Sequence, residues 1–340
     1  MPDASLCLLV FIVVLAIGFG VVNGFNDAAN AIAASIGSRA LSPRNAIILA
    51  ALFNCAGAAT GLAVARTIGK GILAPEAISY LTVIAGLAAV IIWGTAATYL
   101  GLPVSITHGF IAGLAAAGTA VAGSEVIQWG VMQRVASSVV AAPVLGFVGG
   151  FVLMVILFWL FQRSAPASMR VIFSRLQWLT TAFLAYSHGK NDGQMPIGVI
   201  TMALVIYYQG IGQSGRADAL WNNIPWWIII VSALAISLGT AVGGWRVIRT
   251  IGMKVTTLQP IHGFAAQASA AAVIELASQL GIPVSTTHCA SASIMGVGAT
   301  KRLSAVRWGI AGNIVAAWIL TFPICGVLGY LFAWLLEPIL

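Results

Sequence analysis

Charged side chains are scarce in this chain. Only 7% of its 340 residues are Asp, Glu, Lys or Arg and 60% are hydrophobic, whereas about 25% of an ordinary soluble domain is charged. Apolar runs of about 20 residues recur, each long enough to cross a hydrocarbon core of roughly 30 Å. These runs do not alternate as the strands of a transmembrane barrel do. The composition therefore predicts an all-α polytopic membrane protein.

Other absences narrow the possibilities. The four cysteines form no CxxC pair and lie in apolar stretches, which disfavours a metal or disulfide role. No basic residue precedes the first apolar run, so we expect a retained helix there and not a secretory signal. The net charge of +8 does not point to nucleic acid, because the basic residues cluster at the ends of apolar runs and report membrane orientation.

Two short polar phrases occur twice. Gly101-Leu-Pro-Val-Ser-Ile-Thr-His108 returns 180 positions later as Gly281-Ile-Pro-Val-Ser-Thr-Thr-His288. Gly24-Phe-Asn-Asp27 returns 165 positions later as Gly189-Lys-Asn-Asp192. Internal repeats of this kind are typical of transporters whose substrate site lies at the repeat interface. They divide the chain into a first membrane repeat (1–161), a short basic linker (162–178) and a second membrane repeat (179–340).

The number of crossings predicts how the repeats are related. We place five crossings in each half, so the second copy enters from the opposite side and the repeats have inverted topology. The stretch 6–38 is too long for one straight span, and we expect it to break at residues 23–27. Segments 104–121 and 284–300 are short, and either cross the membrane or re-enter. With broken or re-entrant helices, the fold has about 10–12 membrane segments.

Basic residues predict the orientation. If the linker is cytoplasmic, eleven of the sixteen Lys and Arg residues lie on the inner side, as the positive-inside rule requires. Both termini then face outward. The tryptophans near 221–227 form an expected outer-interface belt.

The duplicated aspartates are the first candidate site. A carboxylate in mid-membrane costs about 2.5–3.5 kcal/mol on insertion scales, so Asp27 and Asp192 are unexpected without a function. We expect them to bind cations together with the neutral oxygens of Asn26 and Asn191, because a hard cation such as Na⁺ prefers carboxylate and amide oxygens. Asn30 lies on the same helical face as Asp27. The alternative is that each aspartate is hydrated near an interface or caps a broken helix.

The proline phrases are the second candidate site. Proline ends one segment and a following Ser caps the next helix. The start of that helix offers free N–H groups and a partial positive charge that suit an anion. Two such starts would hold a tetrahedral oxyanion between them, with hydroxyls from Ser105, Thr107, Ser285, Thr286 and Thr287. The alternative is a pair of ordinary capped turns.

Four further residues have ambiguous roles. His108 and His288 are candidate proton carriers, because their reference pKa of about 6.5 lies near working pH, or they hydrogen-bond at the helix starts. Glu275 carries a proton, pairs with a basic side chain or lies near the outer interface, which is the preferred interpretation. For Lys190 we favour snorkelling to the cytoplasmic surface.

The motifs resemble those of a known family. Gly24-Phe-Asn-Asp-Ala-Ala-Asn-Ala-Ile32, His188-Gly-Lys-Asn-Asp-Gly-Gln194 and Pro283-Val-Ser-Thr-Thr-His288 are similar to the signatures of inorganic phosphate transporters of the PiT type. The resemblance implies symport of phosphate with Na⁺ or H⁺, commonly by a homodimer. It assigns the cations to the Asp and Asn pairs and the phosphate to the Ser and Thr residues, with Asp27 and Asp192 close to both. Asn54 and Gln267 fall where the family places polar helix residues, and join the expected cation ligands.

The chain also departs from the family pattern. Ile106 replaces the hydroxyl that Thr286 supplies in the other half, so the anion site should be lopsided, and Glu275 is an unexpected acid. Larger members insert a long hydrophilic domain between the halves, which this chain lacks.

The expected function is import of phosphate across the plasma (cytoplasmic) membrane, driven by a cation gradient through alternating access. A transporter of sulfate or arsenate and a passive anion channel remain alternatives. Neither aspartate lies in a Gly-x-Gly-Asp context, which disfavours an intramembrane aspartyl hydrolase, and we expect no enzymatic activity.

Overall fold

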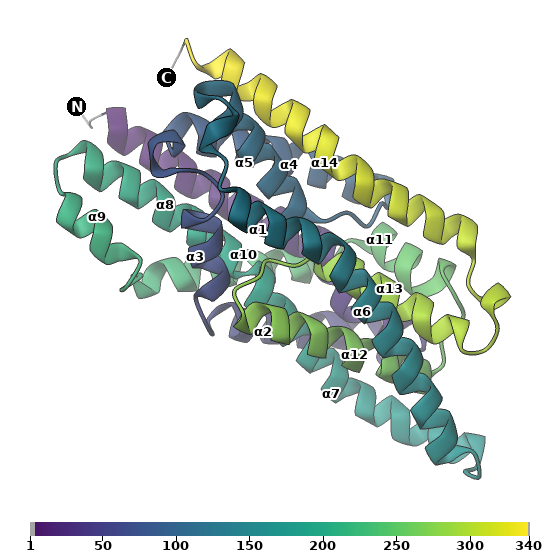
Figure 1. Cartoon of the computed structure of the whole chain (residues 1–340). Coiled ribbons are helices and arrows are strands. Elements are labelled where there is room, and N and C mark those ends of the chain that lie inside the picture. The colour runs from purple at the N-terminus through teal and green to yellow at the C-terminus, as the bar shows by residue number, and fades with distance from the viewer. Residues whose placement is uncertain (1–3, 339–340) are drawn as a thin grey trace.

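The computed structural model describes residues 4–338, which are helical apart from their connections (Figure 1). The first half forms α1 (Ala4–Gly37), α2 (Pro43–Ala58), α3 (Ala63–Lys70), η1 (Pro75–Ala77), α4 (Tyr80–Leu100), α5 (Ile106–Ala122), η2 (Ser124–Val126) and α6 (Trp129–Phe161). The second half forms α7 (Pro166–Asp192), α8 (Gln194–Gly210), α9 (Ser214–Leu220), α10 (Trp226–Val242), α11 (Trp245–Arg249), η3 (Thr250–Lys254), α12 (Pro260–Gln279), α13 (Thr286–Ala299), η4 (Leu303–Ala305) and α14 (Trp308–Leu336). No strand occurs within residues 4–338, and the all-α prediction is confirmed.

Bent helix pairs occur at the matching place in both halves. The axes of α2 and α3 differ by 69°, and those of α10 and the helix formed by α11 and η3 differ by 62°. In each half the bent pair is followed by a straight helix (α4 or α12), a short helix (α5 or α13) and a long one (α6 or α14). This shared order is what two repeats predict, and the broken helices are confirmed. Their inverted relation stays a prediction.

The outer helices have the surface of a membrane protein. Within the described range, α1, α4, α6 and α14 are long and apolar enough to cross a membrane, and the two bent pairs raise this number to six. Exposed large apolar side chains line α6 and α14, a surface that suits lipid. At 1.5 Å per residue, the 17-residue α5 and the 14-residue α13 fall short of a core of about 30 Å, which favours re-entrant placement.

The expected break in the first helix is wrong. α1 runs unbroken from Ala4 to Gly37, and Gly24 serves close packing instead. A Cβ on Gly24 would overlap the carbonyl oxygen of Ile236 on α10, and a Cβ on Gly239 would overlap that of Val21 on α1. Reciprocal glycines therefore let the two backbones touch.

The second copy of the motif uses the same device. A Cβ on Gly189 would overlap the carbonyl oxygen of Asn54 on α2, and a Cβ on Gly57 would overlap that of Tyr186 on α7. Here the helix does end inside the motif region, at Asp192, and α8 begins after Gly193. The two copies thus share a helix crossing but differ in helix continuity.

The linker region is largely helical. Residues 162–165 connect α6 to α7, and α7 begins at Pro166, so most of 162–178 forms its first turns. The α6–α7 connection lies at one end of the molecule, and both chain ends lie at the other (Figure 1). We call these the linker end and the terminal end.

The two halves interlock. α5 of the first half packs against α14 of the second, and α13 packs against α6. α1 likewise packs against α10, and α7 against α2. Each copy of the duplicated motifs is consequently held against the other half, and the motifs meet in the middle.

Candidate functional site

The two motif aspartates meet around a histidine. Asp27 on α1 and Asp192 at the end of α7 are 2% and 0% exposed, and His188, one turn before Asp192, is also fully buried. The Nε2 atom of His188 lies 2.9 Å from Asp192 Oδ2 and 3.9 Å from Asp27 Oδ2. Candidate ligand atoms of these three residues all lie within 4.8 Å of one another. We call them the central triad.

Both nitrogens of the His188 ring face acceptors. Nδ1 lies 2.8 Å from Asn54 Oδ1, and the Asn54 amide nitrogen is committed to Thr240 Oγ1 at 2.8 Å. A doubly protonated ring would donate to Asn54 through Nδ1 and pair by charge with Asp192 through Nε2. In that form the central triad holds two carboxylates and one imidazolium, and carries one net negative charge.

Threonines at the two short-helix starts reach across the halves. Thr287 at the start of α13 donates to Asp27 Oδ1 at 2.9 Å, and Thr107 at the start of α5 donates to Asp192 Oδ1 at 3.2 Å. Thr286 donates to Asp192 Oδ2 at 2.8 Å. The hydroxyls expected to bind an anion therefore converge on the carboxylates expected to bind cations, and the two predicted sites are one.

The two predicted serines cap their own helices. Ser105 accepts from the His108 backbone N–H at 3.2 Å, and Ser285 accepts from the His288 backbone N–H at 3.1 Å. They fix where α5 and α13 begin. This places the adjacent threonines and the free N–H groups of the first turns toward the centre.

One face of α1 presents amide side chains around Asp27. Asn23 and Asn30 lie four residues before it and three after it, and Asn26 precedes it directly; all three are at most 3% exposed. The Asn26 amide nitrogen donates to Thr98 Oγ1 at 2.7 Å, and that of Asn30 to Thr287 Oγ1 at 2.9 Å. The Oδ1 atoms of all three asparagines, and Nδ2 of Asn23, have no hydrogen-bond partner among the described residues. Buried oxygens without donors suit a cation.

Asn23 and His188 are the two residues that sequence reasoning missed. They occupy the same place in the two motif copies, one turn before the aspartate. The i, i+4 spacing of a polar residue to a membrane carboxylate was the available signal. The copies differ at this position, so comparison for identity alone passes over it.

Asn191 and Gln267, two other predicted cation ligands, are not part of the α1 asparagine group around Asp27. Asn191 donates to Asp192 Oδ1 at 2.7 Å and to the Val284 carbonyl at 2.9 Å, joining α7 to the α12–α13 connection. Gln267 lies in a separate polar cluster. Its amide nitrogen donates to the Ala31 carbonyl at 2.8 Å and to Ser35 at 2.7 Å, so it borders α1 one turn beyond Asp27.

Comparison with known proteins identifies the family of this chain. The profile of the phosphate transporter family matches residues 23–329. The chain belongs to the phosphate transporter family. It is 38% identical to a probable low-affinity inorganic phosphate transporter of Bacillus subtilis (strain 168), over 99% of both chains. Identity to a protein of the same name from Rhizobium meliloti (strain 1021) is 40%, over 97% of both. The solved structure of a sodium-dependent phosphate transporter matches with a TM-score of 0.87 and 26% identity, over 98% of this chain and 100% of that one.

In this member of the phosphate transporter family, the two helix-start histidines stack in an aromatic cluster. The rings of His108 and His288 lie 5.2 Å apart between centroids. His108 stacks on Phe322 at 5.3 Å, and His288 on Trp318 at 4.2 Å. No hydrogen bond joins either ring to the central triad among the described residues, so their proton-carrying role stays a prediction.

Lys190, for which the sequence favours snorkelling, is partly buried and pairs with an acid; its position relative to the cytoplasmic surface stays a prediction. Its ammonium pairs with Glu275 of α12 and lies 5.9 Å from the centre of the Tyr186 ring. Gln279 also donates to Glu275, at 2.9 Å. The two charged side chains are 15% and 16% exposed. Glu275 is thus the partner of a basic side chain, the second of its expected roles, and both residues lie beside the centre of this transporter fold.

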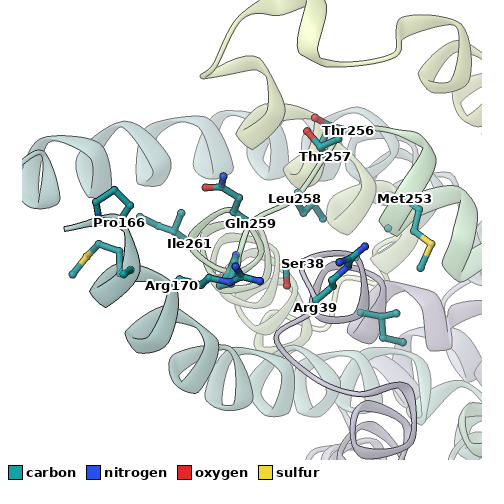
Figure 2. Close-up of a pocket in the computed structure, with 16 residues that line it drawn as sticks. Ser38, Arg39, Pro166, Arg170, Met253, Thr256, Thr257, Leu258, Gln259 and Ile261 are labelled. Atoms are coloured by element: carbon teal, nitrogen blue, oxygen red, sulfur yellow. The ribbon is translucent and has the colours of Figure 1, made fainter. Parts of the chain in front are cut away.

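Two cavities open elsewhere on the molecule. The larger, of about 820 Å³, lies at the linker end between α1, α7 and the η3–α12 connection (Figure 2). The smaller, of about 270 Å³, is lined by Arg66, Lys70, Arg134 and the Leu280–Pro283 backbone. Neither lining includes a residue of the central triad.

Proposed function

We propose that the protein imports inorganic phosphate by symport with a cation. The observation that carries this proposal is the reciprocal pairing of Thr287 with Asp27 and Thr107 with Asp192. It joins a donor-rich anion site to a carboxylate-rich cation site within one buried cluster. Membership of the phosphate transporter family supports phosphate as the anion, and the relatives are named as transporters, which argues against an enzyme.

The phosphate site is proposed at the starts of α5 and α13. Thr107, Thr286 and Thr287 supply hydroxyl donors, and the helix starts capped by Ser105 and Ser285 supply backbone N–H groups. To bind phosphate, the threonines turn their hydroxyls from the carboxylates to the phosphate oxygens. Each charge-assisted hydrogen bond is worth about 1.5–3 kcal/mol. Asp27 and Asp192 stay close enough to accept a proton from a protonated phosphate oxygen.

The cation site is proposed on the α1 face. Asp27 supplies the charge, and Asn23, Asn26 and Asn30 supply oxygens that have no donors among the described residues. A second cation shell is proposed at Asp192, with Asn191 and Asn54 near it. Cation binding by Gln267 remains a prediction, because its amide belongs to the neighbouring cluster.

Charge couples the two ligands. Two carboxylates freed from their threonine donors need a cation in a low-dielectric site, and a phosphate anion beside two carboxylates needs one more strongly. Phosphate binding without cations is therefore disfavoured. Na⁺ at the amide oxygens and H⁺ carried by the central triad are the two candidate coupling ions, and the solved relative is named as sodium-dependent.

The same framework supports alternating access. We propose that the two halves are inverted repeats in the cytoplasmic membrane, with the linker end cytoplasmic and both termini outside. The bent pairs α2–α3 and α10–α11, which occupy equivalent places, would exchange conformations around the centre. We propose a homodimer as the assembly on the family resemblance alone.

Uptake of labelled phosphate into proteoliposomes tests the proposal. An imposed Na⁺ gradient or an inward pH gradient should drive phosphate above its equilibrium level, and the gradient that does so identifies the coupling ion. Accumulation that never exceeds equilibrium would instead show a passive channel. Labelled sulfate and arsenate, run in parallel, separate phosphate from other tetrahedral oxyanions.

A further inference from the structure

A large cavity lies at the linker end, away from the central triad. Its volume is about 820 Å³, and three segments line it: the end of α1 (36–39), the start of α7 (166–170) and the η3–α12 connection (252–261). Gly37 and Gly252 form part of its wall, and a Cβ on Gly37 would overlap the Gly252 carbonyl oxygen. The wall between α1 and η3 is thus a close backbone contact.

The charge of this cavity has one sign. Arg39 and Arg170 enter it from two different elements (Figure 2), and no carboxylate belongs to its lining. Neither arginine forms an ion pair within residues 4–338. Hydroxyl and amide groups complete the polar part of the wall, from Ser38, Thr256, Thr257 and Gln259. Two guanidinium groups without an ion-pair partner among the described residues are suitable donors for a phosphate group.

The helix directions add to this charge. The 27-residue α7 and the 20-residue α12 both begin at the cavity, at Pro166 and Pro260. Their positive ends face the same space as the two arginines. The carbonyl end of α1, which also reaches the cavity, is closed by its own turn, since Ser38 N–H donates to Ala34 and Arg39 N–H to Ile36.

A buried polar connection leads from the cavity toward the centre. The Ser38 hydroxyl donates to Gln177 Oε1 at 2.7 Å, and Gln177 donates to Gln267 Oε1 at 3.2 Å. Gln267 in turn donates to the Ala31 carbonyl, next to Asn30 of the proposed cation face. A chain of hydrogen-bonding side chains therefore runs from the cavity wall to the neighbourhood of the central cluster.

We infer that this cavity binds a phosphate group between Arg39 and Arg170 at the linker end of the protein. The phosphate is either free phosphate leaving the central site or the headgroup phosphate of a lipid. The first source rests on the proposed function, whereas binding itself does not. If the linker end is cytoplasmic, the site holds phosphate on the side where imported phosphate is released.

The test measures phosphate binding to the full-length protein in nanodiscs of zwitterionic lipid, with Na⁺ present because the central site is proposed to bind phosphate together with a cation. Labelled inorganic phosphate is titrated against the parent, the double variant Arg39→Gln/Arg170→Gln, and the control double variant Arg44→Gln/Arg163→Gln. The control removes two arginines that do not line the cavity. We expect two classes of phosphate site in the parent and in the control. The cavity variant should lose one class or bind it at least roughly tenfold more weakly.

A second pair of variants separates this inference from the proposed function. Thr107→Ala/Thr287→Ala should weaken the other class of site and leave the arginine-dependent class unchanged. If only the threonine-dependent class is missing from the parent, the central phosphate site is wrong and the cavity stands. If only the arginine-dependent class is missing, free phosphate does not occupy the cavity.

The lipid source has its own measurement. Native mass spectrometry of protein taken from nanodiscs containing an anionic phospholipid should then show a retained lipid in the parent and control but not in the cavity variant. If the cavity variant matches the control in both phosphate titration and retained lipid, the cavity is not a phosphate site. Arg39→Lys/Arg170→Lys, which keeps the charge, should retain part of the binding in either case.

Discussion

The two copies of the aspartate motif share the way their helices cross a neighbouring helix, but differ in the side chains around the aspartate. Gly24 seats α1 on α10, and Gly189 seats α7 on α2. Each following aspartate accepts a threonine hydroxyl from the other half. The residue one turn earlier differs: the Asn23 side chain has no hydrogen-bond partner among the described residues, whereas His188 bonds to Asn54 through Nδ1 and lies 2.9 Å from Asp192 Oδ2 through Nε2. The two copies therefore share the helix crossing and differ in the side chain one turn before the aspartate.

The same contrast continues away from the centre. Phe25 contacts Tyr99 edge-on, with 6.3 Å between ring centres. The equivalent residue of the second copy, Lys190, pairs with Glu275, which is bonded to Gln279, the equivalent of Tyr99. One side of the centre is thus flanked by an aromatic contact and the other by ions. Solvent and salt weaken ionic contacts and barely affect aromatic ones, so the two sides should respond differently to their surroundings.

The largest effect should come from the aspartates, the feature that the copies share. Asp27→Asn and Asp192→Asn should each abolish gradient-driven phosphate uptake while the protein still folds, because the amide is nearly isosteric and removes a buried charge. Uptake into proteoliposomes and the size-exclusion profile measure the two properties. Parental uptake with unchanged cation dependence in both variants would refute the cation assignment.

Variants of Asn23 and His188, one turn before the two aspartates, should show how the two copies differ in function. Asn23→Ala should raise the cation concentration needed for half-maximal uptake by roughly tenfold, as expected for loss of one contact to a charged group. His188→Asn should lower the maximal rate by roughly ten- to a hundredfold, because it removes the imidazole that lies between the two carboxylates. Uptake measured against cation and phosphate concentration separates the two outcomes.

Identical kinetic changes in these two variants would contradict a division of labour between the copies. Ser187→Ala, next to His188 but outside the central triad, is the matched control. It should transport at close to the parental rate.

The sequence predicts which polar residues come together better than it predicts the path of the chain. Asp27 and Asp192 were expected to meet, because duplicated polar residues in apolar repeats have few other reasons to exist. The sequence predicts a helix break near Gly24, because a glycine within a helix allows either bending or close packing of a neighbouring helix. Only the position of α10 distinguishes them.

Contacts between residues far apart in the sequence are the other feature that the sequence does not predict. Lys190 lies 85 positions from Glu275, and no local pattern connects them, so snorkelling was the expected outcome. Gln267 is bonded to Ala31 and Ser35, one turn beyond Asp27, and its cation binding stays a prediction. His188 and Asn23 went unrecognised because the copies differ there.

Intermediate effects should follow from the shared crossing. Gly24→Ala and Gly189→Ala each put a methyl group into a backbone carbonyl of the facing helix, and such overpacking costs about 1–3 kcal/mol. Both variants should lower the thermal unfolding temperature by similar amounts. Gly18→Ala, whose Cβ would meet no atom within 4 Å, should leave it unchanged. A large drop for Gly24→Ala with none for Gly189→Ala would show that the two crossings are not equivalent.

The smallest effect should come from the ion pair, and it should depend on salt. A partly exposed pair contributes about 0–1 kcal/mol, so Lys190→Met and Glu275→Gln should each change uptake by no more than roughly fivefold. If the pair holds one side closed, both variants and their double should change the rate equally, because either change removes the same contact. The difference from the parent should shrink at high ionic strength, where the pair is already screened. Phe25→Leu, at the equivalent position, should show no such dependence on salt. Separate additive effects of Lys190→Met and Glu275→Gln, unaltered by salt, would mean that Lys190 acts on Asp192 or on the anion and not through Glu275.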